Sequence, residues 1–160
     1  MKEKHRIMFV CHGNICRSPI AQFVFLDLLR KSGDVEKFTV ESSATSTEEI
    51  YSGIGNPIYP PAKEILKANG IPFFERRAVL LSRSDYEKYD LFVGMDSANI
   101  RNMYRIFGSD KQKKIKKLMD FTGRDRDVSD PWYTRRFDIA YNDIYEGCRA
   151  LLEYLISEEE

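Results

Sequence analysis

The sequence predicts an α/β fold: a small, mostly parallel central sheet with helices on both of its faces. Two observations carry this prediction. Short apolar runs, each typical of a buried strand, recur along the chain. Amphipathic segments of helical length lie between and after them, and strands that alternate with such helices form parallel sheets covered on both sides.

Each predicted element begins or ends at a recognisable signal. The predicted strands are the apolar runs at residues 7–10, 38–40, 91–95 and 115–119. The predicted helices cover residues 18–32, 60–69, 98–107 and 137–155. Ser18-Pro19 supplies an N-cap and a first-turn proline for the first helix, and Asp96 supplies a cap for the third. Residues 42–56, rich in Ser, Thr and Gly, predict a long loop, and such loops are often functional.

Composition limits the classes of protein to which the chain can belong. Its 160 residues predict one domain spanning 1–160. Lys plus Arg number 25 and Asp plus Glu number 25, so the formal charge is zero and no nucleic-acid partner is expected. No apolar run approaches the roughly 18 residues of a spanning helix, so no membrane association is expected. Three cysteines, an odd number, argue against a disulfide framework, and we expect a reducing, cytoplasmic location.

The loop after the first predicted strand carries the chemistry. Cys11 ends this strand, and Arg17 follows where the helix begins. If the loop curls, its backbone N–H groups and the positive end of the helix converge on one point, which suits a phosphate-sized dianion. Arg17 adds a two-pronged donor for two phosphate oxygens, and the same field stabilises the Cys11 thiolate as a nucleophile. The remaining residues of this predicted phosphate-binding loop are His12, Gly13, Asn14, Ile15, Cys16 and Ser18.

Each of these residues also has an ordinary structural interpretation. A cysteine at the end of an apolar strand is, taken alone, more often core filler than a nucleophile. A lone arginine is most often part of a surface ion pair. The combination of both, with Gly13 between them and Ser18-Pro19 after them, favours the catalytic interpretation. His5 and His12 are the only histidines, too few for a usual metal site or a Ser-His-Asp triad.

The active-site signature of the low-molecular-weight protein tyrosine phosphatases resembles residues 10–19 of this chain, Val-Cys-His-Gly-Asn-Ile-Cys-Arg-Ser-Pro. The resemblance continues through residues 41–45, 90–99 and 130–133 into the last helix. It implies a cysteinyl-phosphate mechanism that needs no metal or other cofactor. In that mechanism Cys11 is the nucleophile, Arg17 the phosphate clamp and Asp130 the general acid and base. The resemblance also implies phosphotyrosine-containing proteins as partners and inorganic phosphate as product, and we expect a monomer or weak dimer.

The residues alone make a weaker case for Asp130. Loss of a phenolate is helped by a proton donor, and hydrolysis of a phosphocysteine needs a base for water, so one carboxyl can serve both steps. Pro131 restricts Asp130 to extended geometry, in a loop rather than within a helix. An aspartate before proline is otherwise an ordinary turn residue. Without the resemblance, its rivals are Asp120, Asp125 and Asp127.

Aromatic residues near Asp130 are candidates for the substrate slot. In the family, the positions after the Asp-Pro pair form one wall of the slot that holds the phenyl ring, and here they are Trp132 and Tyr133. Tyr51, in the long loop, is the candidate for the opposite wall. The loop departs from the family pattern because it carries no tryptophan, and aromatic residues also commonly lie in cores.

A further set of residues is expected to hold the phosphate loop in shape. Asn14, Ser18 and Ser42 match positions that do so in the family by side-chain hydrogen bonds, a role close to that of ordinary turn and cap residues. The family often adds a histidine to this network, and the nearest equivalent here is Arg76.

Cys16 is a candidate redox partner of Cys11. The two lie at opposite ends of a loop that must curl around one phosphate, so their Cα atoms are expected within the roughly 4.4 to 6.8 Å that a disulfide accepts. Such a disulfide would protect Cys11 from irreversible oxidation. In the alternative interpretation, Cys16 is a small loop residue chosen for fit.

Three other functions stay open at this point. An arsenate reductase uses the same fold and loop but needs further cysteines, and only Cys148 remains, on the apolar stripe of the last helix. A protein-arginine phosphatase is a closer rival, because those relatives tend to carry threonine where this loop has Ile15. A noncatalytic phosphate-binding module needs neither thiol nor acid, so the combination of Cys11, Arg17 and Asp130 argues against it.

Overall fold

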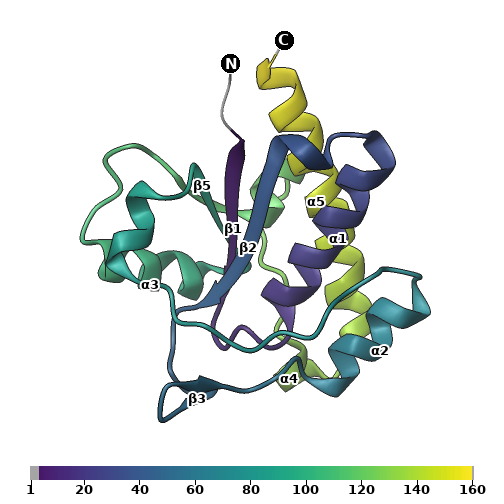
Figure 1. The fold of residues 1–160 in the computed structure, drawn as a ribbon, viewed down its shortest axis with the longest axis vertical. Helices are drawn as coiled ribbons and strands as arrows, with labels where there is room; N and C mark the ends of the chain where they lie inside the picture. The colour runs from purple at the N-terminus through teal and green to yellow at the C-terminus, as the bar shows by residue number, and fades with distance from the viewer. Residues whose placement is uncertain (1–3, 160) are drawn as a thin grey trace.

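Within residues 4–159, which the computed structural model describes, the central sheet has four strands, all of them parallel (Figure 1). The strands of this sheet are β1 (His5–Cys11), β2 (Phe38–Ala44), β5 (Leu91–Gly94) and β6 (Ile115–Lys117). Their order is β2-β1-β5-β6, so β1 lies in the interior of the sheet and pairs with both β2 and β5. The predicted parallel sheet is confirmed.

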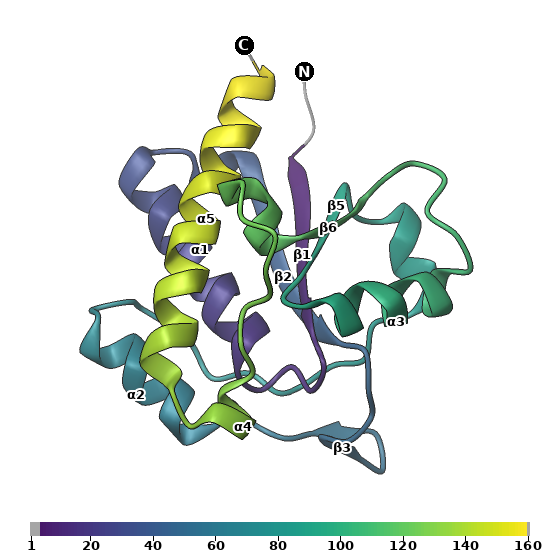
Figure 2. The same cartoon turned by 180° about the vertical axis from the view of Figure 1, so that it is seen from behind.

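Helices cover both faces of the sheet, as predicted (Figure 1; Figure 2). The α-helices are α1 (Arg17–Ser32), α2 (Pro60–Ala68), α3 (Ser97–Phe107), α4 (Pro131–Thr134) and α5 (Phe137–Glu159). Short 3-10 helices occupy Val35–Lys37, Arg83–Glu87 and Leu118–Thr122. α1 and α5 pack against each other on one face of the sheet, and α3 covers the other. No helix in the described part of the chain is long and apolar enough to cross a membrane.

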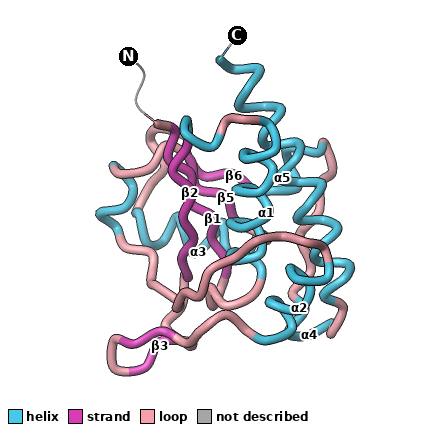
Figure 3. The backbone as a smooth tube through the Cα atoms, turned by 45° about the vertical axis from the view of Figure 1, so that its right-hand side comes forward, coloured by secondary structure: helices cyan, strands magenta, loops and turns pink. Residues whose placement is uncertain are grey.

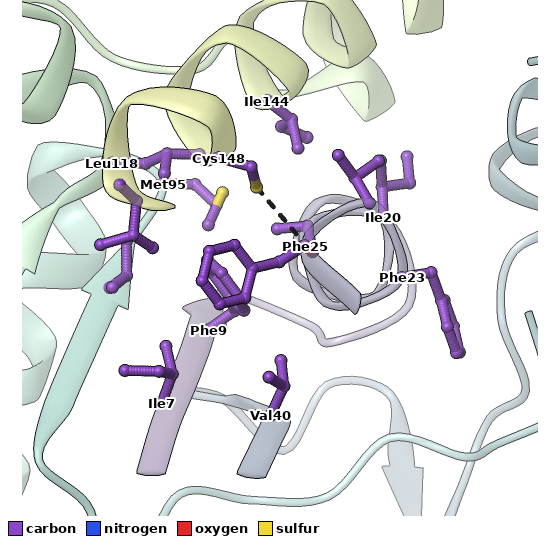
Figure 4. Close-up of a cluster of buried hydrophobic side chains, with 14 of the residues drawn as sticks. Ile7, Phe9, Ile20, Phe23, Phe25, Val40, Met95, Leu118, Ile144 and Cys148 are labelled. Atoms are coloured by element: carbon purple, nitrogen blue, oxygen red, sulfur yellow. Dashed lines mark hydrogen bonds between the residues drawn. The ribbon is translucent and has the colours of Figure 1, made fainter. Parts of the chain in front are cut away.

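The interior strand β1 is buried from both sides, which explains its unbroken apolar run. Ile7 and Phe9 point into the core beneath α1 and α5. Met8 and Val10 join the cluster beneath α3. Figure 4 shows Phe9 packed edge to face against Phe25, with ring centroids 5.6 Å apart. Because burial of each such side chain contributes about 1.5–3 kcal/mol, the strand that leads to the phosphate loop is anchored on both faces.

The long loop predicted after the second strand contains a small hairpin. β2 continues to Ala44, and the antiparallel strands β3 (Ile50–Tyr51) and β4 (Ile54–Gly55) follow. Ser52 and Gly53 connect them with φ values of 51° and 78°, the left-handed backbone that a two-residue hairpin turn requires. Figure 3 shows the hairpin standing apart from the central sheet. Strands of two residues show no alternation along the sequence, so the pattern did not predict them.

The fourth strand is shorter than predicted, because β6 ends at Lys117. Leu118 instead begins a 3-10 helix that packs against α5. A Cβ added at Gly147 of α5 would lie 2.5 Å from Leu118 Cγ, so the two elements meet where only glycine fits. The extended backbone therefore covers three residues here, and Leu118 packs against α5 from the 3-10 helix that follows.

The edge of the sheet at which the parallel strands end is the place for a site. Cys11 is in register with Ala44 at the ends of β1 and β2, and Val10 pairs with Gly94 at the end of β5. The residues that follow these three strands therefore lie close together.

Candidate active site

The thiol of Cys11 lies at the end of β1, buried and surrounded by hydrogen-bond donors. The backbone N–H groups of Asn14 and Ser18 donate to its sulfur across 3.3 and 3.4 Å. The Ser18 Oγ lies 3.0 Å from the same sulfur. Because this oxygen already accepts a hydrogen bond from Asn14 Nδ2 at 2.8 Å, its own proton is free to point at the sulfur. Converging donors of this kind stabilise an anion.

The Arg17 guanidinium is held in a fixed orientation beside the loop. Its Nη1 donates to Asp96 Oδ2 at 2.8 Å and to the Val128 carbonyl at 2.9 Å. Its Nη2 lies 3.5 Å from Asp130 Oδ2. Burial would lower the pKa of Arg17, but the negative groups around it, Cys11 first and then Asp96, raise that pKa above its ordinary value. The loop therefore contains a buried, permanently charged cation.

Asn14 shapes the loop with both ends of its amide. Its backbone φ of 60° lies in the left-handed region, which asparagine tolerates better than most residues. Its Nδ2 donates to Ser18 Oγ and, at 3.0 Å, to Ser42 Oγ. Its Oδ1 accepts from the Val79 N–H at 3.1 Å and from Arg76 Nη2 at 2.9 Å. The buried amide thus uses both its donors and its acceptor, and the structure brings together all three predicted loop-supporting residues.

Arg76 enters this network from the segment between α2 and β5. It also donates to Ser42 Oγ and, across 3.3 Å, to Gln22 Oε1. The Ser42 hydroxyl in turn donates to Gln22 Oε1 at 2.7 Å. Burial lowers the pKa of Arg76, an effect that Glu41 partly offsets. Because a guanidinium only donates, it fixes Asn14 with its carbonyl toward Arg76 and its NH₂ group toward the loop.

Asp130 reaches the site as the N-cap of α4. Its Oδ1 accepts a hydrogen bond from the Trp132 N–H at 3.0 Å, which satisfies a donor at the start of the helix. Its Oδ2 faces Arg17, and the side chain is 30% exposed, so water can reach the carboxyl.

The rival aspartates lie outside this arrangement. Asp127 accepts hydrogen bonds from the Ser97 N–H and hydroxyl and pairs with Lys117 at 3.1 Å, at the start of α3. Asp125 is fully exposed and lies 3.8 Å from Lys117. Neither of these, nor Asp120, lines the cavity that Asp130 lines.

The thiol, the guanidinium and the carboxyl surround one cavity of about 130 Å³. Its lining residues are Cys11, His12, Gly13, Asn14, Ile15, Cys16, Arg17, Glu48, Glu49, Asp130, Trp132 and Tyr133. Trp132 is half exposed and its ring lies 5.1 Å from that of Tyr59, whereas Tyr133 is almost fully exposed. Ser18 is buried behind the cavity, against the sulfur. Tyr51 lies on β3, 65% exposed and outside this lining, so its role in the slot stays a prediction.

Sequence reasoning missed three residues of the site. Asp96 was predicted only as a helix cap, although its place directly after the strand 91–94 puts it at the same edge of the sheet as Cys11. Glu48 and Glu49 line the cavity, and no pattern in the loop distinguished them from an ordinary solvent-exposed pair of charges.

The likeness to known proteins extends over almost the whole chain. Residues 6–160 match the family model for the low molecular weight phosphotyrosine protein phosphatases. The chain belongs to this family. It is 35% identical to the low molecular weight protein-tyrosine-phosphatase YfkJ of Bacillus subtilis, over 96% of this chain and 97% of that protein. The crystal structure of YfkJ is similar with a TM-score of 0.93, at 34% identity and with 99% of each chain covered.

The fold of this phosphatase is also found in a protein described by a different substrate. The crystal structure of DARP, a Drosophila arginine phosphatase, covers 93% of this chain and 96% of its own, with a TM-score of 0.82 and 25% identity. A common fold therefore leaves the choice between phosphotyrosine and phosphoarginine to the residues of the cavity.

All three cysteines of this phosphatase are free. Cys16 lines the cavity, and burial, together with the negative charges of Cys11 and Asp130, raises the pKa of its thiol. Cys148 lies in the core, where its thiol faces the Ala21 carbonyl at 3.7 Å and burial raises its pKa (Figure 4). Both are therefore neutral thiols at pH 7.

Proposed function

We propose that this phosphatase hydrolyses phosphotyrosine in proteins through a cysteinyl-phosphate intermediate. The observation that carries the proposal is the convergence of the Cys11 thiol, the Arg17 guanidinium and the Asp130 carboxyl on one cavity. A nucleophile, an anion clamp and an acid are the three parts that transfer of a phosphoryl group requires.

In the first step the Cys11 thiolate attacks phosphorus. The phosphoryl oxygens accept hydrogen bonds from the backbone N–H groups of the loop and from Arg17, so charge that develops on them is stabilised in place. The bond between phosphorus and the tyrosyl oxygen breaks, and Asp130 gives its proton to that oxygen. The products are tyrosine, a phosphocysteine and an ionised Asp130.

In the second step water replaces the thiolate on phosphorus. Asp130, now a carboxylate, takes a proton from the water as its oxygen bonds to phosphorus, and the sulfur–phosphorus bond breaks. Inorganic phosphate leaves, and Cys11 returns to the thiolate that the Asn14 and Ser18 N–H groups support. One carboxyl thus serves as acid and then as base.

Phosphotyrosine fits the walls of the cavity better than its rivals. Trp132 and Tyr133 offer aromatic faces to a phenyl ring. Ile15 places an apolar side chain in the loop, where arginine phosphatases tend to carry threonine. An arsenate reductase needs further thiols near the loop besides Cys11 and Cys16, and the remaining cysteine, Cys148, is buried in the core on α5.

We also propose a cytoplasmic location for this enzyme. Three free cysteines, one of them at the centre of the site, suit a reducing compartment. A monomer or weak dimer, acting on phosphoproteins, stays a prediction.

One experiment separates the candidate functions. Turnover of an aryl phosphate, a phosphotyrosine peptide, phosphoarginine and arsenate is measured side by side with the same enzyme preparation. The proposal expects rapid release of phosphate from the first two and at most slow turnover of the others. Faster turnover of phosphoarginine than of the phosphotyrosine peptide would overturn the substrate assignment, and reduction of arsenate would overturn the reaction class.

A further inference from the structure

Two carboxylates, those of Glu48 and Glu49, line the same cavity as the Cys11 thiol. Glu48 Oε2 lies 2.9 Å from His12 Nε2, and the Glu48 side chain is 70% exposed, so it lies at the outer rim. Glu49 packs directly on the phosphate loop, because a Cβ added at Gly13 would come within 3.1 Å of its Cγ. Both side chains therefore lie against the loop that is proposed to bind phosphate, Glu48 through its carboxylate and Glu49 through its aliphatic stem.

The charges around the cavity do not balance in favour of an anion. Arg17, the fixed cation of the loop, is already paired with Asp96 at 2.8 Å, and Asp130 adds no positive charge when it is protonated as the acid. Glu48 is paired with His12, but Glu49 has no ion pair within residues 4–159. Two or more negative charges close to a dianion weaken its binding.

We infer that the physiological substrates carry a basic side chain next to the phosphotyrosine. This inference rests on the proposed function and narrows its substrate class. A lysine or arginine of the substrate would neutralise Glu48 and Glu49 while the phenyl ring lies against Trp132. An acidic side chain in the same place would add to the repulsion, so the rim also selects against acidic phosphopeptides.

Glu48 and Glu49 lie at the rim of the cavity. This position favours a lysine or arginine next to the phosphotyrosine as the source of the positive charge, rather than the guanidinium of a phosphoarginine leaving group. Glu48 is mostly exposed at the mouth of the cavity, beyond the buried Cys11 and the loop residue Ile15. Residues on either side of a phosphotyrosine pass this mouth, whereas a phosphoarginine guanidinium would lie deeper, next to Ile15. Phosphoarginine is therefore an outcome that the test has to separate.

The expected size of the effect follows from the exposure of the pair. Exposed ion pairs contribute about 0.2–1 kcal/mol, which is about 1.5- to 5-fold in kcat/KM for each charge. Such an effect is screened by salt, since the Debye length falls from about 10 Å at 0.1 M to about 3 Å at 1 M.

The experiment measures kcat/KM for phosphotyrosine peptides that differ only in the flanking residues, which are lysine, alanine or glutamate. These peptides are given to the wild type, to Glu48→Gln, to Glu49→Gln and to the double variant, at low and high salt. Glu153→Gln is the matched control, because it removes the same charge from an exposed residue in the C-terminal part of α5. The C-terminal end of α5 and the β3 hairpin lie at opposite ends of the molecule (Figure 1). Inhibition by inorganic phosphate is measured with each variant.

The inference expects the order lysine, alanine, glutamate for the wild type and for Glu153→Gln, with about 1.5- to 5-fold between neighbours for each charge. In the double variant and at high salt, the three peptides are expected to have nearly equal kcat/KM values. Inorganic phosphate inhibits Glu49→Gln more strongly than the wild type, because an opposing charge is gone. If the wild type processes all three peptides equally fast, the inference is wrong and the proposed function stands. Phosphoarginine is given to the wild type beside the peptides. If it is processed and no peptide is, the inference and the proposed function both fail, and the cation belongs to the leaving group.

Discussion

The phosphate loop is largely buried and densely hydrogen-bonded, whereas the rim of the same cavity is exposed and has few polar contacts. In the loop, Asn14 uses its whole amide and Arg17 has three polar partners. At the rim, Trp132 and Tyr133 are 50% and 82% exposed, and Glu49 has no ion pair within the described residues. The difference teaches that the groups proposed to act on phosphorus are fixed by the scaffold, while those proposed to meet the rest of the substrate stay open to water.

Among the variants expected to keep some activity, Asp130→Asn should show the largest effect. Asn cannot give the proton that a phenolate of high basicity needs, so the rate for a poor leaving group falls by about 10²- to 10⁴-fold. A good leaving group needs little protonation, so its loss is much smaller. The measurement is kcat/KM for a series of aryl phosphates of different leaving-group basicity, because this ratio reports the step in which the leaving group departs and not the later hydrolysis of the phosphocysteine. Equal losses across the series would assign Asp130 to the N-cap of α4 alone.

Replacing Arg76 with leucine breaks the anchor of the loop at a distance from the phosphate. The Asn14 carbonyl and the Gln22 carbonyl each lose a donor. Both oxygens keep another donor, the Val79 N–H and the Ser42 hydroxyl, so what each loses is a hydrogen bond from a charged group. Such a bond contributes about 1.5–3 kcal/mol, so we expect kcat/KM to fall roughly ten- to a hundred-fold. Arg77→Leu is the matched control, because the Arg77 side chain donates to the Gly55 carbonyl in the hairpin and not to the loop network of the described residues.

The readout for Arg76 has to distinguish positioning from a general loss of stability. Thermal unfolding and phosphate affinity are therefore measured beside kcat. Arg76→Lys is included because a lysine ammonium restores the positive charge and a donor but not the planar set of donors of a guanidinium. Partial rescue by lysine with a folded protein supports the positioning role. An Arg76→Leu protein as active as Arg77→Leu would show that the loop holds its shape without this anchor.

The strands and the phosphate loop were predictable from the sequence, whereas the residues that support the loop from a distance were harder to predict. Residues 7–10 and 91–94 form continuous apolar runs because both faces of their strands are buried, and such runs predict interior strands of a parallel sheet. The loop was predictable because its chemistry is local: a thiol, a glycine and an arginine follow one another between a strand and a helix. What the loop needs from elsewhere was harder to predict, since Arg76 reaches Asn14 across 62 positions.

The acidic part of the rim was not predictable from the sequence, for a related reason. Glu48 and Glu49 lie in a loop rich in Ser and Thr, where a pair of acidic residues is an ordinary solvent-exposed feature. Their place on the cavity depends on the β3–β4 hairpin, whose two-residue strands leave no period in the sequence. Pairing of strands this short is decided by the Ser52-Gly53 turn and by tertiary contacts rather than by pattern.

Trp132→Ala tests the rim with a smaller expected effect. An aromatic contact contributes about 0.5–1.5 kcal/mol beyond its burial, so the preference for phosphotyrosine over phosphoserine peptides should fall about two- to tenfold, while a small aryl phosphate loses less. The measurement is the ratio of kcat/KM for peptides of matched sequence. If the wild type itself processes both peptides equally well, the aromatic slot is wrong.

Cys16→Ser is expected to change the rate least, because within residues 4–159 the Cys16 thiol makes no hydrogen bond on which the loop depends. Its effect should appear after oxidation. Peroxide converts the Cys11 thiolate to a sulfenic acid, and the Cys16 thiol then displaces water to form a disulfide, which dithiothreitol reduces. The wild type should therefore recover much more activity than the variant, and bound phosphate should slow closure of the disulfide. If both proteins recover the same activity, Cys16 has no protective role and is a small residue that packs in the loop.

The central claim, that phosphate passes through Cys11, is tested most directly by trapping the intermediate. A phosphotyrosine peptide is mixed with wild type, with Asp130→Asn to slow hydrolysis, and with Cys11→Ser, and each reaction is stopped by rapid denaturation before mass spectrometry. The account predicts one phosphoryl group on the peptide that contains Cys11 in the first two proteins. It predicts no turnover for Cys11→Ser, which still binds inorganic phosphate through Arg17 and the loop N–H groups. A phosphoryl group on any other residue, or substantial turnover by Cys11→Ser, would contradict it.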